Sequence, residues 1–377
     1  MDVFLNRISK FLPNKAVSND EIEESVGLIN DNKSINRGLI LRSNQIKTRY
    51  YAIDLDGNPT HSNAEMTAIA VRNLFDDKIT LEDIELLTAG TSSPDAIQPS
   101  HASMVHGELG GHNMEVMSAG GTCNAGMLSL RYAQMAILSG QIKNAVCAGS
   151  EAFGGWMHAR NFEKEIDKRK EIEENPYVAF EKDFLRWMLS DGAAAILMQN
   201  KPNEKGISLK IDWLEIKSFA NELETCMFAG CVKEDNGKIV GWKAMTEDQR
   251  NLHSVFSLKQ DARLLQENIV KYGGLFMKSV FDKHQLTVDD IDYFLPHLSS
   301  MFFKKRVYDG LIEHGIGIPD EKWYLNLTRV GNVGAASAFL LLEEIFNSGK
   351  LRKGQKLLVL VPESARFSYA LMLLTVV

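Results

Sequence analysis

Three polar residues stand where a turn leads into a predicted helix, and their types suggest nucleophilic and hydrogen-bonding roles. Cys123 lies among glycine, alanine and threonine, after an apolar run and before a helical pattern. The positive end of a helix lowers the pKa of a thiol, and small neighbours leave room for a carbonyl group. Cys123 is therefore a candidate nucleophile, although it could also be a small buried residue, as we interpret Cys147.

The other two candidates are a histidine and an asparagine. His297 follows Pro296 at the end of an apolar run, and Ser299 and Ser300 after it are typical of a helix cap. Active sites of open α/β sheets lie at the carboxyl ends of strands, which favours a functional His297. Asn332 lies between glycines before a helix, where asparagine is also common for turn geometry alone.

An internal repeat places Cys123 and Asn332 at equivalent positions. Residues 80–87 (TLEDIELL) resemble residues 287–294 (TVDDIDYF), and residues 138–143 (LSGQIK) resemble residues 347–352 (NSGKLR). The offset of the second pair carries Cys123 onto Asn332. Two halves with one geometry and different chemistry at the same turn predict a paired site at a pseudo-twofold axis.

Short apolar runs alternate with helical patterns in both halves, which predicts an α/β fold with strands buried on both faces. We expect a first half at 1–200 that carries Cys123 and a second half at 201–377 that carries His297 and Asn332. The expected helices are 65–75, 99–109, 124–138, 262–281, 300–314 and 335–346. The expected strands are 84–89, 115–117, 145–148, 291–295, 323–325, 356–361 and 368–376.

Two segments fall outside the repeat and could carry specificity. Residues 219–250 contain Asn236-Gly237, which predicts a hairpin. Residues 154–190 are an insertion whose charged part, 163–174, predicts a solvated helix. The aromatic residues of the insertion could cover a pocket, belong to the core or form a dimer contact; they are Trp156, Phe162, Phe180, Phe184 and Trp187.

Composition excludes several classes of protein. The formal net charge of -7 argues against nucleic-acid binding. Four cysteines in 377 residues do not make a disulfide framework, and Cys226 and Cys231 lack a nearby histidine pair, so we expect no metal site. We expect neither a signal peptide nor a membrane span, and hence a cytoplasmic protein.

Cys123, Pro296-His297 and residues 331–337 (GNVGAAS) together resemble the Cys-His-Asn triad of the β-ketoacyl-acyl-carrier-protein synthase III family, in the thiolase-like superfamily. Residues 18–22, 91–95, 98–100 and 190–195 also resemble segments of that family. The resemblance implies a five-layered αβαβα fold, a homodimer, no cofactor, and a Claisen condensation, decarboxylative or not. The substrates would be thioesters of acyl carrier protein or coenzyme A.

The resemblance also implies roles for individual residues. Cys123 would take the first acyl group, with its backbone N–H in an oxyanion hole whose second amide falls near Ala365. His297 and Asn332 would bind the second thioester and stabilise its enolate. Acyl carrier proteins are acidic, so three basic residues after His297 are docking candidates, although a solvated helix face would look the same: Lys304, Lys305 and Arg306.

Departures from the family pattern suggest a particular branch. Arg366 stands within a segment where the family has three glycines, Gln98 replaces an apolar gate, and residues 34–51 lack the tryptophan that stacks on coenzyme A. These changes resemble the branch that joins two carrier-bound fatty-acyl intermediates into dialkylresorcinols. Two alternatives remain: a transferase that acylates an alcohol or amine, and a non-catalytic partner subunit, against which the intact triad argues.

Overall fold

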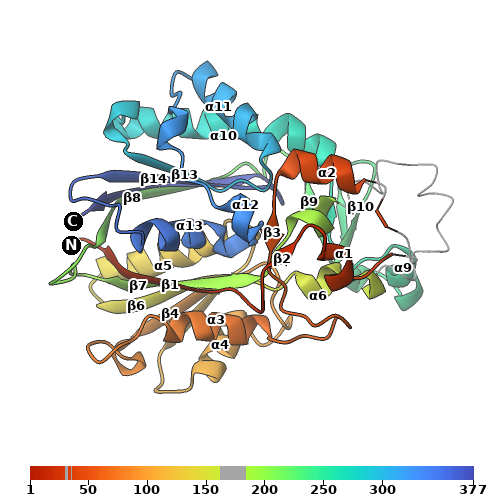
Figure 1. The fold of residues 1–377 in the computed structure, drawn as a ribbon, viewed down its shortest axis with the longest axis horizontal. Helices are drawn as coiled ribbons and strands as arrows, with labels where there is room; N and C mark the ends of the chain where they lie inside the picture. The colour runs from red at the N-terminus through yellow and green to blue at the C-terminus, as the bar shows by residue number, and fades with distance from the viewer. Residues whose placement is uncertain (30–32, 35, 162–183) are drawn as a thin grey trace.

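The computed structural model describes residues 1–29, 33–34, 36–161 and 184–377. Helices and sheets alternate in five layers (Figure 1). The outer helices at the top of the view are α10 (Ala262–His284) and α11 (Phe302–Glu313), and those at the bottom are α3 (Asn63–Arg72) and α4 (His101–Leu109). Between the sheets lie α5 (Ala125–Leu138) and α13 (Ser337–Phe346). The predicted five-layered fold is confirmed.

The strands of the two halves follow one order. The first half runs β5-β4-β6-β7-β1 and the second β13-β14-β15-β8, and a short β1–β8 pairing joins them into one nine-stranded sheet. The first-half strands are β1 (Phe4–Phe11), β4 (Leu86–Gly90), β5 (Glu115–Ala119), β6 (Asn144–Glu151) and β7 (Gly192–Gln199). The second-half strands are β8 (Leu209–Ser218), β13 (Tyr293–Pro296), β14 (Lys356–Glu363) and β15 (Ser368–Val376).

The strand directions match as well. The pairs β4–β6 and β13–β14 are parallel, and the pairs β6–β7 and β14–β15 that follow them are antiparallel. The predicted strand at 323–325 is wrong, because Trp323 makes only an isolated bridge to Phe294 after the 3-10 turn η6 (Asp320–Lys322). The bridge places Trp323 beside β13 in the second half. In the first half, β5 occupies the equivalent position beside β4. The match supports the proposal that 1–200 and 201–377 are duplicated halves.

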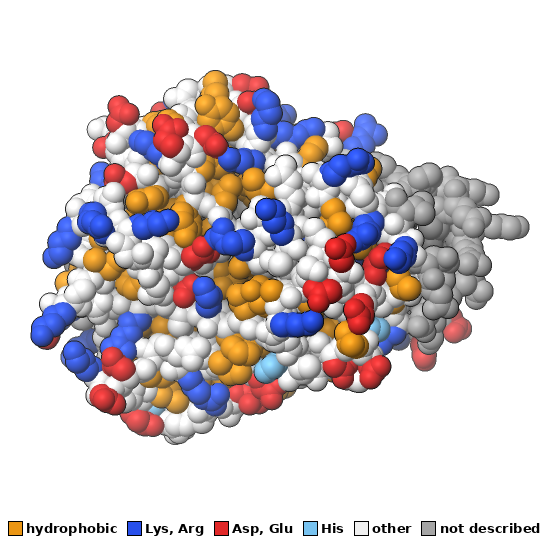
Figure 2. Space-filling view, viewed as in Figure 1, with side chains coloured by type: hydrophobic (Ala, Val, Ile, Leu, Met, Phe, Trp, Pro, Cys, Tyr) orange, Lys and Arg blue, Asp and Glu red, His pale blue; other side chains and the backbone are white. Residues whose placement is uncertain are grey.

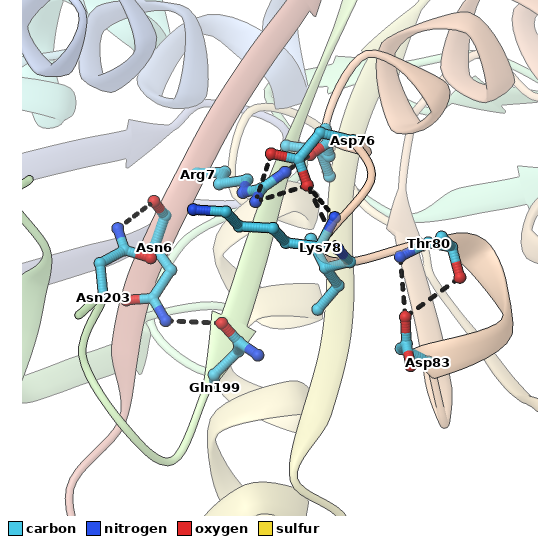
Figure 3. A network of polar contacts seen from close by, with 10 residues as sticks. Asn6, Arg7, Asp76, Lys78, Thr80, Asp83, Gln199 and Asn203 are labelled. Atoms are coloured by element: carbon cyan, nitrogen blue, oxygen red, sulfur yellow. Dashed lines mark hydrogen bonds and ion pairs between the residues drawn. The ribbon is translucent and has the colours of Figure 1, made fainter. Parts of the chain in front are cut away.

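The repeat is also visible in its caps. The backbone N–H of Thr80 donates to Asp83 Oδ2 at 2.8 Å, and that of Thr287 donates to Asp290 Oδ2 at 2.9 Å. These boxes begin the 3-10 helices η1 (Leu81–Asp83) and η5 (Val288–Asp290). Figure 3 draws the Thr80 cap beside the contacts that fasten β1, in which Arg7 pairs with Asp76.

The halves meet closely at their central turns. Gly126 on α5 packs against Ala335 in η7 (Gly334–Ala336), which precedes α13. A Cβ on Gly126 would lie 2.3 Å from the Ala335 carbonyl oxygen, so only glycine permits this approach. The offset that relates Cys123 to Asn332 also relates Gly126 to Ala335. Two equivalent positions therefore touch at the junction of the halves.

The segments outside the repeat are partly described. The predicted hairpin is present as β10 (Cys231–Lys233) and β11 (Ile239–Gly241). Trp187 is a core residue, whereas the predicted helix at 163–174, Phe162 and Phe180 lie outside the described residues. In the part of the chain described, no helix combines the length and apolarity that crossing a membrane requires.

Further short elements lie in the described chain. The helices are α1 (Ile22–Ser25), α2 (Arg37–Asn44), α6 (Gly154–Met157), η2 (Ala159–Asn161), η4 (Trp242–Ala244), α9 (Glu247–Leu252) and α12 (Leu327–Val330). The strands are β2 (Val17–Ser18), β3 (Thr48–Arg49), β9 (Met227–Phe228) and β12 (Lys259–Gln260). Of these, α12 leads directly into the turn that carries Asn332.

Candidate active site

One cavity brings Cys123, His297 and Asn332 together from both halves of the chain. It holds about 910 Å³ of empty space, counting its opening to solvent, and all three residues line it. Cys123 immediately precedes the N-cap of α5, His297 follows the last residue of β13, and Asn332 lies between α12 and η7. The three residues are 8%, 3% and 3% exposed, so the site is largely shielded from water.

The electrostatic surroundings of Cys123 differ from the expectation. Burial raises the pKa of the Cys123 thiol, and the nearby carboxylates of Glu363 and Glu151 raise it further. The prediction of a lowered thiol pKa is therefore wrong, because desolvation and the two nearby carboxyl groups outweigh the effect of the helix end. The protonated thiol is the resting form, and its proton must leave as a bond to sulfur forms.

His297 is fixed by the sheet and is uncharged. Its backbone N–H donates to the carbonyl of Leu360 at 2.8 Å, which continues the pairing of β13 with β14. Burial lowers the pKa of His297 to about 4, so the neutral imidazole is present at neutral pH. A neutral ring carries one N–H donor, which suits a hydrogen bond to a carbonyl or enolate oxygen.

Asn332 is held at both its backbone and its side chain. Its N–H donates to the Met188 carbonyl at 3.0 Å, and its own carbonyl accepts from the Ser190 N–H at 2.9 Å. Its Oδ1 accepts from the backbone N–H of Gly334 at 2.9 Å. Because the oxygen is fixed toward its own turn, the Nδ2 group is the end that can donate to a substrate.

The predicted pocket residues lie elsewhere. The Ala365 N–H donates to Glu363 Oε1 at 2.6 Å, so it is not open to an oxyanion, whereas the preceding Ser364 lines the cavity. Arg366 is exposed and donates to the Leu223 carbonyl at 3.3 Å. Gln98 is also exposed, and neither Gln98 nor Arg366 lines the cavity in the part of the chain described.

The three basic side chains of α11 differ in their contacts with neighbouring residues. Lys304 pairs with Asp320 at 2.6 Å and is partly buried. Lys305 pairs within the helix with Asp309, and the Arg306 guanidinium lies over the Phe302 ring, 4.3 Å from its centroid. Lys305 and Arg306 are exposed. Across the face in Figure 2, positive and negative side chains are interspersed, so any basic docking site there would be local.

Sequence reasoning missed two buried carboxylates next to Cys123. Glu151 ends β6 and Glu363 ends β14, and both raise the pKa of the Cys123 thiol. Glu363 accepts from the Thr122 hydroxyl and from the N–H groups of Ala365 and Ser368. A glutamate closing a long apolar run in each half was the signal that could have identified them.

Comparisons with known proteins agree with this arrangement. Residues 281–375 match the family model described as 3-oxoacyl-[acyl-carrier-protein (ACP)] synthase III C terminal. The β-ketoacyl-[acyl-carrier-protein] synthase III of Clostridium perfringens is 25% identical over 314 residues, which cover 83% of each chain. Many further curated proteins match as well. The matching proteins of Rickettsia typhi and Chlorobaculum tepidum are also described as β-ketoacyl-[acyl-carrier-protein] synthase III.

Two solved structures share the fold over the full chain. A variant of Xanthomonas campestris OleA has a TM-score of 0.74 at 18% identity, covering 100% of this chain and 99% of its own. FabH from Pseudomonas aeruginosa PAO1 has a TM-score of 0.72 at 16% identity, covering 100% and 98%. The chain is therefore similar to β-ketoacyl-acyl-carrier-protein synthase III enzymes, in sequence over most of its length and in fold over all of it.

Proposed function

We propose that the chain joins two fatty-acyl thioesters by a Claisen condensation at Cys123, His297 and Asn332. The observation that carries this proposal is the shielded cavity into which the two halves bring a thiol and two neutral hydrogen-bonding groups. The similarity to β-ketoacyl-acyl-carrier-protein synthase III enzymes supports a condensing enzyme. The residue roles, the chain lengths and the product belong to the proposal.

In the first step, the Cys123 sulfur attacks the carbonyl carbon of an acyl thioester. The carbon–sulfur bond to the carrier breaks, and the carrier thiol leaves with the proton that Cys123 gives up. The backbone N–H of Cys123 would stabilise the tetrahedral oxyanion. Because the Ala365 N–H is occupied by Glu363, the N–H of Ser364, which lines the cavity, is the better second donor.

In the second step, the other thioester forms an enolate by losing carbon dioxide or an α-proton. The N–H of the neutral His297 and the Nδ2 group of Asn332 would donate to its oxygen, where negative charge develops. The enolate carbon then attacks the acyl carbonyl on Cys123. A carbon–carbon bond forms, the carbon–sulfur bond breaks, and Cys123 leaves as a thiolate. The thiolate regains its proton from the α-carbon in the route that loses an α-proton, or from solvent in the route that loses carbon dioxide.

The finer assignment is the production of a cyclohexane-dione-type precursor of dialkylresorcinols from two carrier-bound chains. The departures at Gln98 and in residues 34–51 favour it over acetyl-coenzyme A priming. An OleA structure of the same fold is described with bound lauric acid and lauroyl-CoA. A fold of this kind can therefore hold long acyl chains, as this proposal requires.

A homodimer in the cytoplasm is also proposed. The central helix α5 leaves Leu128, Tyr132 and Met135 at least 36% exposed on one face. The edge strand β5 lies beside α5, since the Tyr132 hydroxyl donates to Glu115 at 2.6 Å. A second copy would cover this apolar face. The exposed Ile97 and Gln98 fit the loop that would cross that interface.

The proposal is tested by the mass of the product. The purified protein is incubated with pairs of fatty-acyl and β-ketoacyl thioesters on a carrier protein and on coenzyme A. A product that joins both chains through carbon supports condensation. A product in which one chain is bound to an added alcohol or amine would establish the transferase alternative, and an inert protein would favour the partner-subunit alternative.

A further inference from the structure

The Thr122 hydroxyl is hydrogen-bonded on two sides. It donates to Glu363 Oε1 at 2.5 Å, and on its other side it forms a hydrogen bond with the Cys123 thiol. A threonine hydroxyl carries a single proton, so it cannot donate to both partners at once. With that proton on the side of Glu363, the hydroxyl oxygen is free to accept from the S–H group of Cys123. Sulfur, hydroxyl and carboxylate therefore form one continuous hydrogen-bonded chain.

Glu363 lies at the inner end of this chain and is held firmly there. Its side chain is buried, and its Oε1 also accepts from the Ala365 N–H at 2.6 Å. Its Oε2 accepts from the N–H and the hydroxyl of Ser368, at 3.3 and 3.1 Å. Among the described residues, Thr122 and Cys123 line the cavity and Glu363 does not. Thr122 therefore connects the carboxylate with the reacting sulfur.

Movement of a proton along this chain avoids a pair of like charges. Glu363 raises the pKa of the Cys123 thiol because a thiolate formed by loss of a proton to solvent would face a carboxylate. If the thiol proton moves to Glu363 instead, the two groups share one negative charge before and after the transfer. The Thr122 hydroxyl then donates to the thiolate and stabilises it. The carboxylate that opposes ionisation toward solvent thus permits ionisation by internal transfer.

We propose that Thr122 relays the proton of Cys123 to Glu363 when the sulfur attacks an acyl thioester. As the sulfur–carbon bond forms, the S–H bond breaks, Thr122 Oγ1 takes that proton, and its own proton moves to Glu363 Oε1. When the carbon–sulfur bond to the carrier breaks, the reverse path gives the proton to the carrier sulfur. The protein therefore gains and loses no proton overall. This inference rests on the proposed acylation of Cys123 and adds the group that accepts its proton.

The test compares two reactions of the same sulfur in Glu363→Gln. An amide cannot take up the proton, and desolvation, the largest cause of the raised pKa, still keeps the thiol protonated at neutral pH. Acylation by octanoyl thioesters of coenzyme A and of a carrier protein at neutral pH should therefore fall by roughly a hundredfold or more. Alkylation by iodoacetamide at mildly alkaline pH uses thiolate that has lost its proton to solvent. It should become faster, because a negative charge is gone.

Variants of Thr122 test the middle of the relay. Thr122→Val removes the hydroxyl and should lower acylation by a similar factor, whereas Thr122→Ser keeps the hydroxyl and should retain most of the rate. The matched control is Thr375→Val at the other end of β15. It removes a threonine hydroxyl that donates to Asp212 Oδ2 at 2.5 Å, and Thr375 is not among the described residues that line the cavity. Its acylation rate should match that of the wild type.

The outcomes separate the relay from a structural role and from the proposed function. Acylation by Glu363→Gln at or above the wild-type rate would overturn the relay. Losses of both acylation and alkylation in that variant would do so too, because they would show that Glu363 only holds the turn. Equal losses in Thr122→Ser and Thr122→Val, or in Thr375→Val, would contradict it as well. If iodoacetamide labels wild-type Cys123 but no thioester acylates it, the proposed function fails and the relay fails with it.

Discussion

Glu151 and Glu363 end equivalent strands of the two halves, and each carboxylate binds the functional turn of the opposite half. Glu151 ends β6 and accepts from the backbone N–H of Ala335, in the turn after Asn332, at 3.1 Å. Glu363 ends β14 and accepts from the hydroxyl of Thr122, the residue before Cys123. The two buried carboxylates therefore brace the two turns against each other.

Hydrogen bonds from the second half hold both chain neighbours of Cys123, Thr122 and Asn124. Thr122 bonds directly to Glu363, and the Asn124 side chain donates to the Ser368 hydroxyl at 3.0 Å. Ser368 in turn donates to Glu363 at 3.1 Å. Cys123 is thus held from the second half, next to negative charge that raises the pKa of its thiol. Position and thiol acidity are opposed at this site.

The first prediction uses this opposition. Glu363→Gln removes a negative charge near Cys123 and should lower the pKa of the thiol, whereas Thr122→Val removes a hydrogen bond that lowers it and should raise it. Alkylation by iodoacetamide at mildly alkaline pH should become roughly three- to tenfold faster in Glu363→Gln for each unit by which the pKa falls, because the thiolate fraction rises tenfold while each thiolate becomes less nucleophilic. The rate should fall in Thr122→Val.

The opposite signs make this prediction specific. A loosened fold would expose the thiol in both variants and accelerate both reactions, so equal acceleration would contradict the electrostatic account. Thermal unfolding of both variants is the accompanying control. In the wild type, the N–H of Ser368 donates to the Glu363 carboxylate. Glu363→Gln should lose some stability, because an amide nitrogen would face that N–H instead.

The second prediction concerns Glu151 and pH. Burial raises the pKa of Glu151 from 4.5 to about 7 in the folded chain, so the folded state binds the proton more tightly than the unfolded state. This group therefore stabilises the fold below about pH 4.5, and the contribution is lost as the pH rises to about 7. Between those two pH values, the free energy of unfolding of Glu151→Gln should rise by about 2–3 kcal/mol relative to that of the wild type.

Chemical denaturation at several pH values measures this difference. The amide of Glu151→Gln also misses some hydrogen bonds, but that cost does not change with pH and leaves the slope unaffected. Glu108→Gln on the exposed end of α4 is the matched control and should follow the wild-type curve. Parallel curves for Glu151→Gln and wild type would show that Glu151 does not titrate in this range.

The repeat made much of the fold predictable from the sequence. Alternating apolar runs identified most helices and the strands that bear the site, and Thr80 and Thr287 marked equivalent caps. The strands β1 and β8 were missed, because their sequences are interrupted by polar residues that are satisfied only through distant partners. Asn6, for example, bonds to Gln199 and accepts from Asn203 (Figure 3).

The site was predictable only in its three polar residues. Cys123, His297 and Asn332 stand at turns that local sequence and the repeat both mark. The acidity of Cys123 was not predictable, because it depends on Glu151 and Glu363, which approach only through the fold. The apolar lining of the cavity was missed for the same reason, since an apolar helix face that lines a cavity has the same pattern as one that packs in the core.

The third prediction is that Cys123 alone carries the acyl group. Cys147 is inside β6, and Cys226 and Cys231 are buried away from the cavity lining. Cys123→Ala should abolish acyl-enzyme and product while the protein keeps its thermal transition. Peptide mapping after incubation with acyl thioesters locates the modification. An acyl group on another cysteine, with Cys123 unmodified, would remove the basis of the mechanism.

The fourth prediction separates acylation from condensation. His297→Ala and Asn332→Ala should lower condensation by about a hundredfold or more while acylation of Cys123 changes much less, because both side chains are assigned to the enolate. Single-turnover acylation and steady-state product formation measure the two steps. Equal losses in both steps would show that the roles are not divided between the two substrates.

The pH dependence gives a second check on His297. Because burial lowers the pKa of His297 to about 4, the ring is neutral from neutral pH down to about pH 5. Condensation should therefore show no loss from protonation of His297 across that range. A titration of the second step near pH 6.5 that disappears in His297→Ala would mean that the ring is charged in the working enzyme.

The last prediction concerns the carrier protein. Lys304 is partly buried and paired with Asp320, so its reversal would also break a contact within the chain, whereas Lys305 and Arg306 are exposed on α11. The double change Lys305→Glu and Arg306→Glu should raise the KM for carrier-bound substrate several-fold. A short thioester mimic should be used almost normally, because it needs no docking surface. Exposed pairs contribute only about 0–1 kcal/mol each, so both changes are needed together.

The matched control reverses two basic residues far from α11 in the sequence. Lys201→Glu and Lys205→Glu are exposed, lie in the connection between β7 and β8, and change the net charge by the same amount. If they raise the KM equally, the effect is one of overall charge and not of docking. Equal losses with the carrier substrate and the mimic would instead place Lys305 and Arg306 in support of His297, whose turn begins the same helix. Only a selective loss in the α11 variant supports a carrier site at this helix.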